Sequence, residues 1–222
     1  MAALIGQDYY LAQKDRLLKN HDKLLALGTA QFVARWGEAE AQHIIAQTRA
    51  EFERLIPQIP YIGGKENSFT DTIEQMTSLL ALYRTLKARG TPLDEIGQLS
   101  HHMAQAWIDQ FPALARSIIG RFYMSRWWRK RTEKKALDSQ RREYAGAFVY
   151  EVLPGDGENY QWGVNYLECG VVKYFHAQSA DEFTPYMCVI DFLMFPAMGI
   201  ELKRQGTIAN GCTHCDFRFQ KH

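Results

Sequence analysis

The chain has 222 residues, 46% of them hydrophobic and 23% charged, which are the proportions of a folded globular protein of one or two domains. Its 26 Lys and Arg against 25 Asp and Glu give a net charge of +1, which excludes a general electrostatic affinity for nucleic acid or an anionic membrane. The sequence has no export-signal pattern at its start and no stretch of the roughly 18 apolar residues that a membrane span needs. We therefore expect a cytoplasmic protein that binds a small molecule, with neither nucleic acid nor membrane as a partner.

The N-terminal third is predicted to be helical. Residues 8–55 carry apolar residues at three- and four-residue spacing, which predicts two helices separated near Gly28 or Gly37. The segment PQIPYIGGKENSF at 57–69 contains two prolines and a Gly-Gly pair, so it predicts a loop that could touch a ligand. These amphipathic helices could serve a homo-oligomer interface as well as a core.

Two further helices are predicted from their end signals. Ser68 or Thr70 can cap a helix that ends at Gly90, and Pro92 suits the first position of the next helix. A long amphipathic helix with many Lys and Arg is then expected over residues 121–143. Its charge run admits a nucleic-acid interface, but basic side chains that lie over a core explain it without a partner.

The pattern changes from helix to sheet after residue 143. Residues 145–169 alternate around a PGDGEN turn and predict a β-hairpin. A short helix over 169–178, a longer buried helix over 181–199, a strand over 200–208 and a final strand over 215–220 complete the chain. We predict an α+β fold, with a mostly helical region 1–143 packed on an α+β domain 144–222 whose antiparallel sheet is covered by helices, or one continuous domain.

The four cysteines lie in the last 54 residues and are expected to be reduced. Cys212-x-x-Cys215 is half of a zinc site, a redox pair or coincidence, and a four-ligand site would also need His214 with Cys169 or Cys188. Zinc or another divalent metal is therefore an open alternative, although no cofactor is firmly implied.

The other chemical reading makes one thiol a nucleophile, and Cys169 suits that role because it lies at a predicted strand-to-helix junction. A buried cysteine that only packs is the plainer interpretation. Asp191 lies in an otherwise apolar run, where a carboxylate needs a partner: either an ion pair with Arg204 or Lys203, or a role as acid, base or orienting group for His214.

Four segments resemble the L-2-amino-thiazoline-4-carboxylic acid hydrolase family: PYIGGKEN (60–67), LALYRTLKARG (80–90), NYLECG (165–170) and DFLMFPAMGIELKRQGTIANGCTHCDFRF (191–219). The last is the most specific, because the family shows an acid followed by a pattern like E-L-x-R-x-x-T-I-x-x-G-x-x-H-C-D-F-R. The residues in those places here are Asp191, Glu201, Arg204, Thr207, Gly211, His214, Cys215, Asp216 and Phe217, with Asn165 and Cys169 upstream.

The resemblance implies hydrolytic opening of a cyclic C=N substrate, as in the conversion of 2-aminothiazoline-4-carboxylate to N-carbamoyl-cysteine. The expected catalytic residues are Cys169, Asp191, His214 and Cys215, and the expected substrate-binding residues are Asn165, Glu201, Arg204 and Thr207. In one version a Cys169 or Cys215 thiolate attacks and His214 moves the proton, and in another a metal on Cys169, Cys215 and His214 or Glu201 activates water. A looser resemblance to vinyl-4-reductase-type sensing domains implies a small-molecule-binding domain with a structural zinc site and no catalysis.

Overall fold

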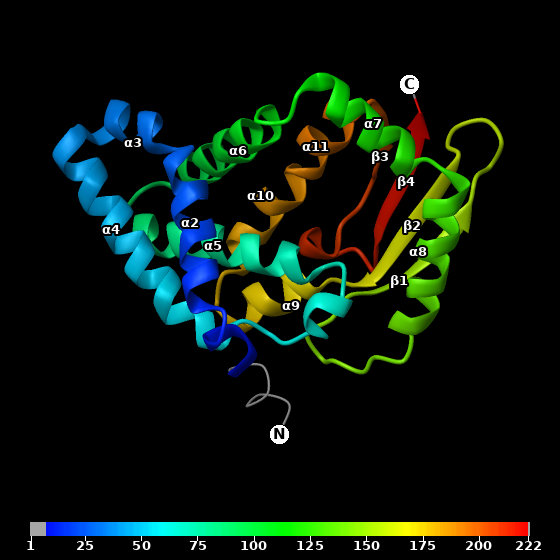
Figure 1. Ribbon diagram of the computed structural model, residues 1–222, viewed down its shortest axis with the longest axis horizontal. Coiled ribbons are helices and arrows are strands. Elements are labelled where there is room, and N and C mark those ends of the chain that lie inside the picture. Colours follow the sequence, from blue (N-terminus) through cyan, green and yellow to red (C-terminus); the bar gives the residue numbers. More distant parts are fainter. Residues whose placement is uncertain (1–7, 222) are drawn as a thin grey trace. The chain divides into compact units, whose positions relative to one another are not determined.

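The computed structural model describes residues 8–221, which form an α+β fold with a four-stranded antiparallel sheet, as predicted (Figure 1). The chain forms two compact units. The first comprises the described residues up to Trp107 together with Tyr174–Phe183, and the second comprises Ile108–Lys173 together with the described residues from Thr184 onward. This division differs from the predicted boundary after residue 143. No helix in the described part of the chain is both long and apolar enough to cross a membrane.

The first unit is helical. Its elements are α2 (Lys14–Ala26), α3 (Thr29–Trp36), α4 (Glu38–Leu55), the 3₁₀ turns η1 (Ile56–Gln58) and η2 (Gly64–Glu66), α5 (Thr70–Ala88), most of α6 (Leu93–Asp109) and the 3₁₀ turn η3 (Asp181–Phe183). The chain breaks at both Gly28 and Gly37, so α2, α3 and α4 replace the two helices predicted there. Gly37 joins α3 to α4 with a φ of 80°, a conformation that favours glycine.

Helix α5 begins at the predicted place but without the predicted cap. Phe69 occupies the N-cap position and no side chain caps the helix. Thr70 instead donates its hydroxyl to the Gly64 carbonyl at 2.6 Å, and the Asn67 amide donates to the Ile62 carbonyl at 2.6 Å. Thr70, one of the two residues expected to cap the helix, therefore helps Asn67 to hold the preceding loop together.

The second unit contains the sheet. Its elements are α7 (Ala113–Tyr123), α8 (Arg126–Ser139), β1 (Val149–Pro154), β2 (Trp162–Glu168), the start of α9 (Gly170–Ala177), α10 (Thr184–Val189), α11 (Asp191–Ala197), β3 (Ile200–Lys203), the 3₁₀ turn η4 (Ile208–Asn210) and β4 (Cys215–Lys221). The single basic helix predicted over 121–143 is wrong, because α7 ends before Ser125, which caps α8 by accepting the Trp128 N–H at 3.2 Å. The single helix predicted over 181–199 is likewise divided, at Ile190, into α10 and α11.

The predicted hairpin is present as β1 and β2, and the strand order is β1-β2-β4-β3 with antiparallel pairing throughout. Successive side chains of a strand point to opposite sides of the sheet, so the sheet has two different faces. The side chains of what we call the inner face are mostly buried: Tyr150, Trp162, Val164, Tyr166, Leu202, Cys215, Phe217 and Phe219. The outer face carries polar side chains, including Glu151, Asn165, Glu201, Asp216 and Arg218.

Helices α7 and α11 cover part of the inner face. The Tyr123 ring of α7 lies 5.3 Å from the rings of Trp162 and Phe219 and 5.4 Å from that of Phe195 on α11, measured between centroids. Edge-on and tilted aromatic contacts of this kind stabilise a core beyond the area they bury. The inner face is thus a largely buried aromatic surface, and the residues at the start of β4 on this face belong to the candidate site.

Candidate functional site

Three thiols of the second unit interact with one another. Cys169 lies between β2 and α9, Cys188 lies in α10, and Cys215 begins β4 on the inner face. Burial is the main cause that raises the pKa of Cys169 to about 12 and that of Cys188 to about 11, and the nearby Cys215 raises both further. Burial also raises the pKa of Cys215. At neutral pH the three side chains are therefore protonated thiols unless a base accepts a proton.

Each thiol has a hydrogen-bond partner that opposes the effect of burial. The Cys215 sulfur accepts the Ile208 N–H at 3.2 Å, and Arg204 also lowers its pKa. The Cys169 sulfur accepts backbone N–H groups at the start of α9, and Cys188 shares a hydrogen bond with the Thr207 side chain. Cys215 thus combines a backbone donor with a nearby cation, the two features that stabilise a thiolate.

Arg204 follows β3 and is locked in place. Its side chain is 5% exposed, and it donates to Asp191 Oδ2 and to the Cys188 carbonyl, each at 2.6 Å. The guanidinium carbon also lies 4.8 Å from the ring centres of Phe192 and Phe217. The Asp191–Arg204 ion pair is one of the alternatives that the sequence left open. Arg204 therefore holds the Asp191 carboxylate in place, and its binding of a substrate carboxylate stays a prediction.

Asp191 is the first residue of α11, and the pKa of its carboxyl group is unusual. Burial is the largest influence and raises its pKa to about 6, although the charge and hydrogen bond of Arg204 act in the opposite direction. The side chain retains 27% exposure, so the carboxylate combines a poorly hydrated setting with access from outside. A carboxyl group with this pKa is mostly ionised at neutral pH and can still accept a proton.

Two tyrosines share this environment. Tyr166 is the β2 residue opposite Cys215, and Tyr123 reaches the inner face from α7. Burial is the first cause that raises the pKa of each hydroxyl, and the negative charge of Asp191 adds to it. Both hydroxyls are therefore neutral and able to donate hydrogen bonds. The sequence analysis missed them because nothing local distinguishes a site tyrosine from a core tyrosine.

The loop after β3 is shaped by Asp216, on the outer face. Its carboxylate accepts the Gln205 N–H at 3.0 Å and the Gly206 N–H at 2.7 Å. The buried Thr207 then accepts the Asn210 N–H at 3.2 Å and so caps η4. These bonds bring the η4 backbone, with its Ile208 donor, to the Cys215 sulfur.

The predicted site residues do not all come together. Cys169, Asp191, Arg204, Thr207 and Cys215 interact around the start of β4, as described above. Asn165 and Glu201 lie on the outer face: the Asn165 amide donates to Glu151 at 2.9 Å, and Glu201 pairs with Gln220 across the strands. A His214 ring nitrogen lies 3.0 Å from the Thr213 hydroxyl, while Asp191 binds Arg204. The predicted roles of Asn165, Glu201 and His214 stay predictions that these contacts do not support.

The two thiols of the CxxC pair have different surroundings. A Cβ atom on Gly206 would lie 2.7 Å from the Cys212 sulfur, which places that exposed thiol against the loop backbone. The Cys215 sulfur is instead buried and bonded to Ile208. Among residues 8–221 no three His, Cys, Asp or Glu side chains are arranged to hold a metal ion. This arrangement does not support the zinc alternative that the CxxC motif left open.

Comparisons with known proteins agree with the resemblance seen in the sequence. The family model described as L-2-amino-thiazoline-4-carboxylic acid hydrolase matches residues 71–219, which include the cysteines, Asp191 and Arg204. No curated protein and no solved structure gives a significant match. Since the matched segment spans more than half of the chain, the protein belongs to the L-2-amino-thiazoline-4-carboxylic acid hydrolase family.

Proposed function

We propose that the protein is a hydrolase that opens a small cyclic C=N substrate of the amidine or thiazoline class. The observation that carries this proposal is Asp191, a carboxylate with a pKa of about 6 held by Arg204 beside the thiols of Cys188 and Cys215. Burial raises the pKa of this carboxylate in spite of its ion pair with Arg204, and an acid with such a pKa is suited to proton transfer. The family description supports the same reaction class.

Cys215 is the proposed nucleophile and Asp191 its base. Asp191 accepts the thiol proton, the sulfur adds to the amidine-like ring carbon, and the ring carbon–sulfur bond breaks while the proton passes to the ring sulfur. The Ile208 N–H and Arg204 stabilise the thiolate before it attacks. Water then adds to the carbon of the adduct, one of its protons goes to nitrogen and the other to the departing Cys215 sulfur. One water is consumed, and an N-carbamoyl thiol is released.

The test is turnover of 2-aminothiazoline-4-carboxylate and simpler thiazolines, followed by mass spectrometry of the product. We expect Asp191→Asn to lower kcat by about 10²- to 10⁴-fold, the usual contribution of a general base. Asp138→Asn is the matched control, because Asp138 is an exposed acid on α8. Wild-type activity in Asp191→Asn would refute the role of this carboxylate.

The nucleophile is tested separately from the base. Cys215→Ser should abolish turnover, together with any adduct seen by mass spectrometry of the intact protein. If Cys215→Ser keeps its activity while Asp191→Asn loses it, Asp191 activates water directly and no covalent adduct forms. If the wild type binds thiazolines tightly but turns none over, the protein is a small-molecule-binding domain and the hydrolase proposal fails.

The pH dependence follows from the Asp191 pKa. Because the base must be ionised, kcat/KM should rise with pH through about 6 and level off above it. Asp191→Glu, which keeps a carboxylate, should retain a rising limb with a shifted midpoint. A profile that is flat from pH 5 to pH 7 would contradict the assignment.

A further inference from the structure

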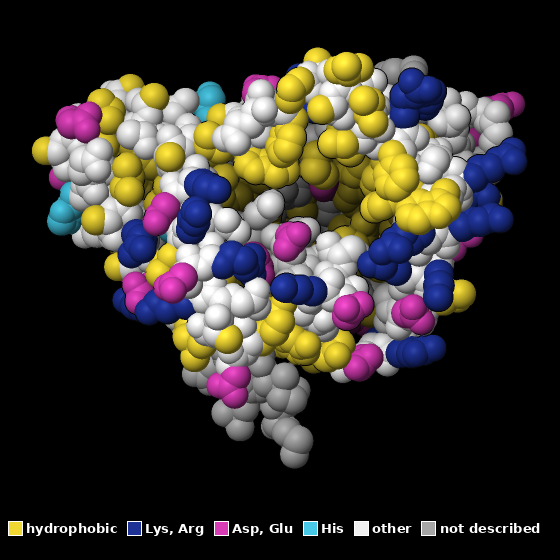
Figure 2. Space-filling model, in the orientation of Figure 1, with side chains coloured by type: hydrophobic (Ala, Val, Ile, Leu, Met, Phe, Trp, Pro, Cys, Tyr) yellow, Lys and Arg dark blue, Asp and Glu magenta, His cyan; other side chains and the backbone are white. Residues whose placement is uncertain are grey.

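Helix α7 presents an exposed apolar face. Leu114, Ile118 and Phe122 follow one another at four-residue spacing and are 74%, 57% and 48% exposed, with Ile119 beside them. The Trp127 ring of α8 is 57% exposed and lies 5.3 Å from that of Phe122, so the apolar surface continues into α8. Figure 2 shows hydrophobic side chains gathered over α7 and the start of α8, with Lys and Arg beside them.

This face is distinct from the one by which α7 is attached to its own unit. Gly120 is buried so closely that a Cβ atom there would lie 1.9 Å from the Met198 carbonyl oxygen. Tyr123 packs on the aromatic rings of the inner face. The helix is thus fixed by its Gly120 and Tyr123 side, and the apolar side of Leu114, Ile118 and Phe122 is not needed for that attachment. Exposed apolar surfaces of this kind mark interaction sites.

The charges around this face are of one sign. Residues 110–132 contain no Asp or Glu and six cationic side chains: Arg116, Arg121, Arg126, Arg129, Lys130 and Arg131. Arg116 pairs with Asp109 and Arg129 with Glu133. For Arg121, Arg126, Lys130 and Arg131, the structure of residues 8–221 shows no ion pair. The net charge of +1 for the whole chain therefore conceals a local cationic surface.

We propose that α7 and the start of α8 form a docking surface for an anionic lipid membrane. An apolar helix face flanked by Arg and Lys complements the boundary between acyl chains and anionic headgroups, where long cationic side chains reach the lipid phosphates. Trp127 has the amphipathic ring that is enriched at this boundary. A second copy of the chain would place these cations opposite one another, and nucleic acid would leave the aliphatic side chains unmatched. The protein binds the membrane through this local charge, whereas the net charge of +1 led us to expect no membrane partner.

The experiment is co-sedimentation of the full chain with phosphatidylcholine vesicles, with and without phosphatidylserine, at low and at physiological salt. Strong binding to the phosphatidylserine vesicles that weakens with salt is expected, together with at least tenfold weaker binding to the neutral vesicles. Equal binding to both kinds, or binding to neither, would overturn the proposal.

Paired variants locate the surface. We expect two double variants to lower vesicle binding about tenfold each: Ile118→Ser with Phe122→Ser, and Arg126→Glu with Lys130→Glu. All four positions are exposed, so polar side chains there should not disturb the fold. Leu137→Ser and Lys203→Glu are the controls, since both residues are exposed outside the surface. Unchanged binding in both test variants, a wild-type dimer that Ile118→Ser dissociates, or an oligonucleotide that displaces the vesicles would each refute a membrane surface.

Discussion

At the scale of single residues, two ionisable groups are held far from their ordinary protonation behaviour. Asp191 is a partly buried acid whose pKa rises to about 6, and His21 is a buried base whose pKa falls to about 3. Burial is the main cause in both cases, because it penalises the charged form. Asp191 has Arg204 as a partner, whereas both His21 ring nitrogens are buried without a hydrogen bond among residues 8–221.

We predict that His21 makes the protein sensitive to acid. The folded state holds this histidine neutral, stacked on Phe52 at 4.2 Å, while the unfolded chain takes up its proton near pH 6.5. Its contribution to stability is therefore present above pH 6.5 and is lost as the pH falls toward 3, by up to roughly 4 kcal/mol. His21→Leu should flatten the fall of the urea midpoint below pH 6.5, and His43→Leu, at an exposed position of α4, should leave it unchanged. An equal acid dependence in His21→Leu and the wild type would show that other groups control it.

At the scale of secondary-structure elements, close backbone contacts determine how the helices pack. We predict that Gly120→Ala destabilises the protein by about 3 kcal/mol, because the added methyl group meets the Met198 carbonyl and must move α7 away from the turn between α11 and β3. Helix propensity alone predicts the opposite sign, since Ala favours a helix by about 1 kcal/mol over Gly. Urea unfolding measures the difference, with Ser117→Ala on the exposed side of α7 as control. A neutral or stabilising Gly120→Ala would contradict the packing.

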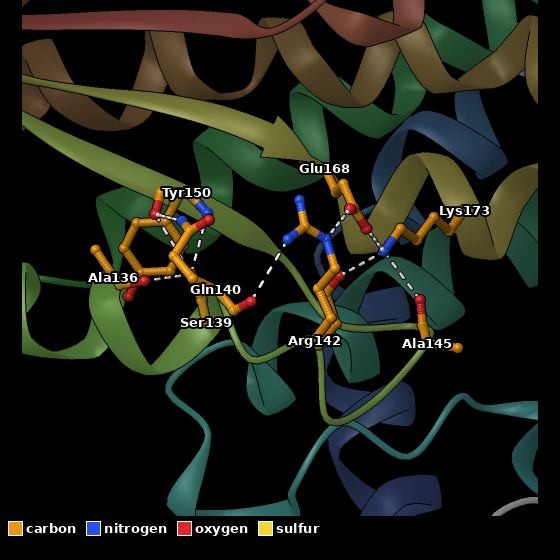
Figure 3. A network of polar contacts seen from close by, with 9 residues as sticks. Ala136, Ser139, Gln140, Arg142, Ala145, Tyr150, Glu168 and Lys173 are labelled. Atoms are coloured by element: carbon orange, nitrogen blue, oxygen red, sulfur yellow. Dashed lines mark hydrogen bonds and ion pairs between the residues drawn. The ribbon is translucent and has the colours of Figure 1, made fainter.

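The segment that joins α8 to β1 is held by one ammonium group (Figure 3). Lys173 of α9 donates to the carbonyls of Ala145 and Ala147, each at 2.9 Å, and pairs with Glu168, which also binds Arg142 at 2.8 Å. Figure 3 shows the Lys173 and Arg142 side chains meeting at the Glu168 carboxylate. The segment between α8 and β1 has no regular secondary structure, so these salt bridges and hydrogen bonds to its carbonyls hold it in place.

We predict that Lys173→Met loosens this segment and costs about 1–3 kcal/mol, because the carbonyls lose a charged donor. Hydrogen exchange of residues 141–148 should accelerate, while exchange in β4 stays slow. Lys134→Met, at an exposed position of α8, provides the comparison. Unchanged exchange in Lys173→Met would mean that the segment is held by its backbone alone.

At the scale of the whole molecule, neither compact unit is one continuous piece of chain. The segment Tyr174–Phe183 belongs to the first unit, where the Phe183 ring stacks on Tyr83 at 4.6 Å and Glu182 pairs with Lys87 at 2.6 Å. The first unit therefore needs a segment that follows three quarters of the way along the sequence.

We predict that a fragment of residues 1–107 does not unfold cooperatively, because the apolar surface around Tyr83 lacks its Phe183 cover. Circular dichroism during urea unfolding tests this against the full chain. A full chain cut at Gly157, in the exposed turn between β1 and β2, is the control and should keep its transition. A sharp, native-like transition in fragment 1–107 would show that the unit is complete without the later segment.

Local patterns in the sequence were sufficient to predict many of the helices and strands of this fold. The apolar periodicity of residues 8–55, the PGDGEN turn and the alternation of Phe217 and Phe219 each depend on neighbouring residues. Helical structure over 8–55, the hairpin and β4 were therefore predicted, although α2, α3 and α4 replace the two helices expected there. The C-terminal motif that resembles the family, at residues 191–219, also identified Asp191, Arg204 and Cys215 as candidate site residues. Helix ends were less predictable: Ser125 interrupts a basic run that continues on both sides, and Thr70, a predicted cap, binds the Gly64 carbonyl of the preceding loop instead.

The sequence by itself determined the fold class, the family and the chemical types in the site. Only the tertiary structure decided which of those groups meet. Sheet pairing places Tyr166 beside Cys215 and turns Asn165 and Glu201 to the opposite face, since neighbouring residues of a strand point in opposite directions. Burial, which no local pattern reports, raises the pKa of Asp191, and packing of α7 by Gly120 leaves its apolar side exposed. These properties depend on contacts between residues far apart in the chain.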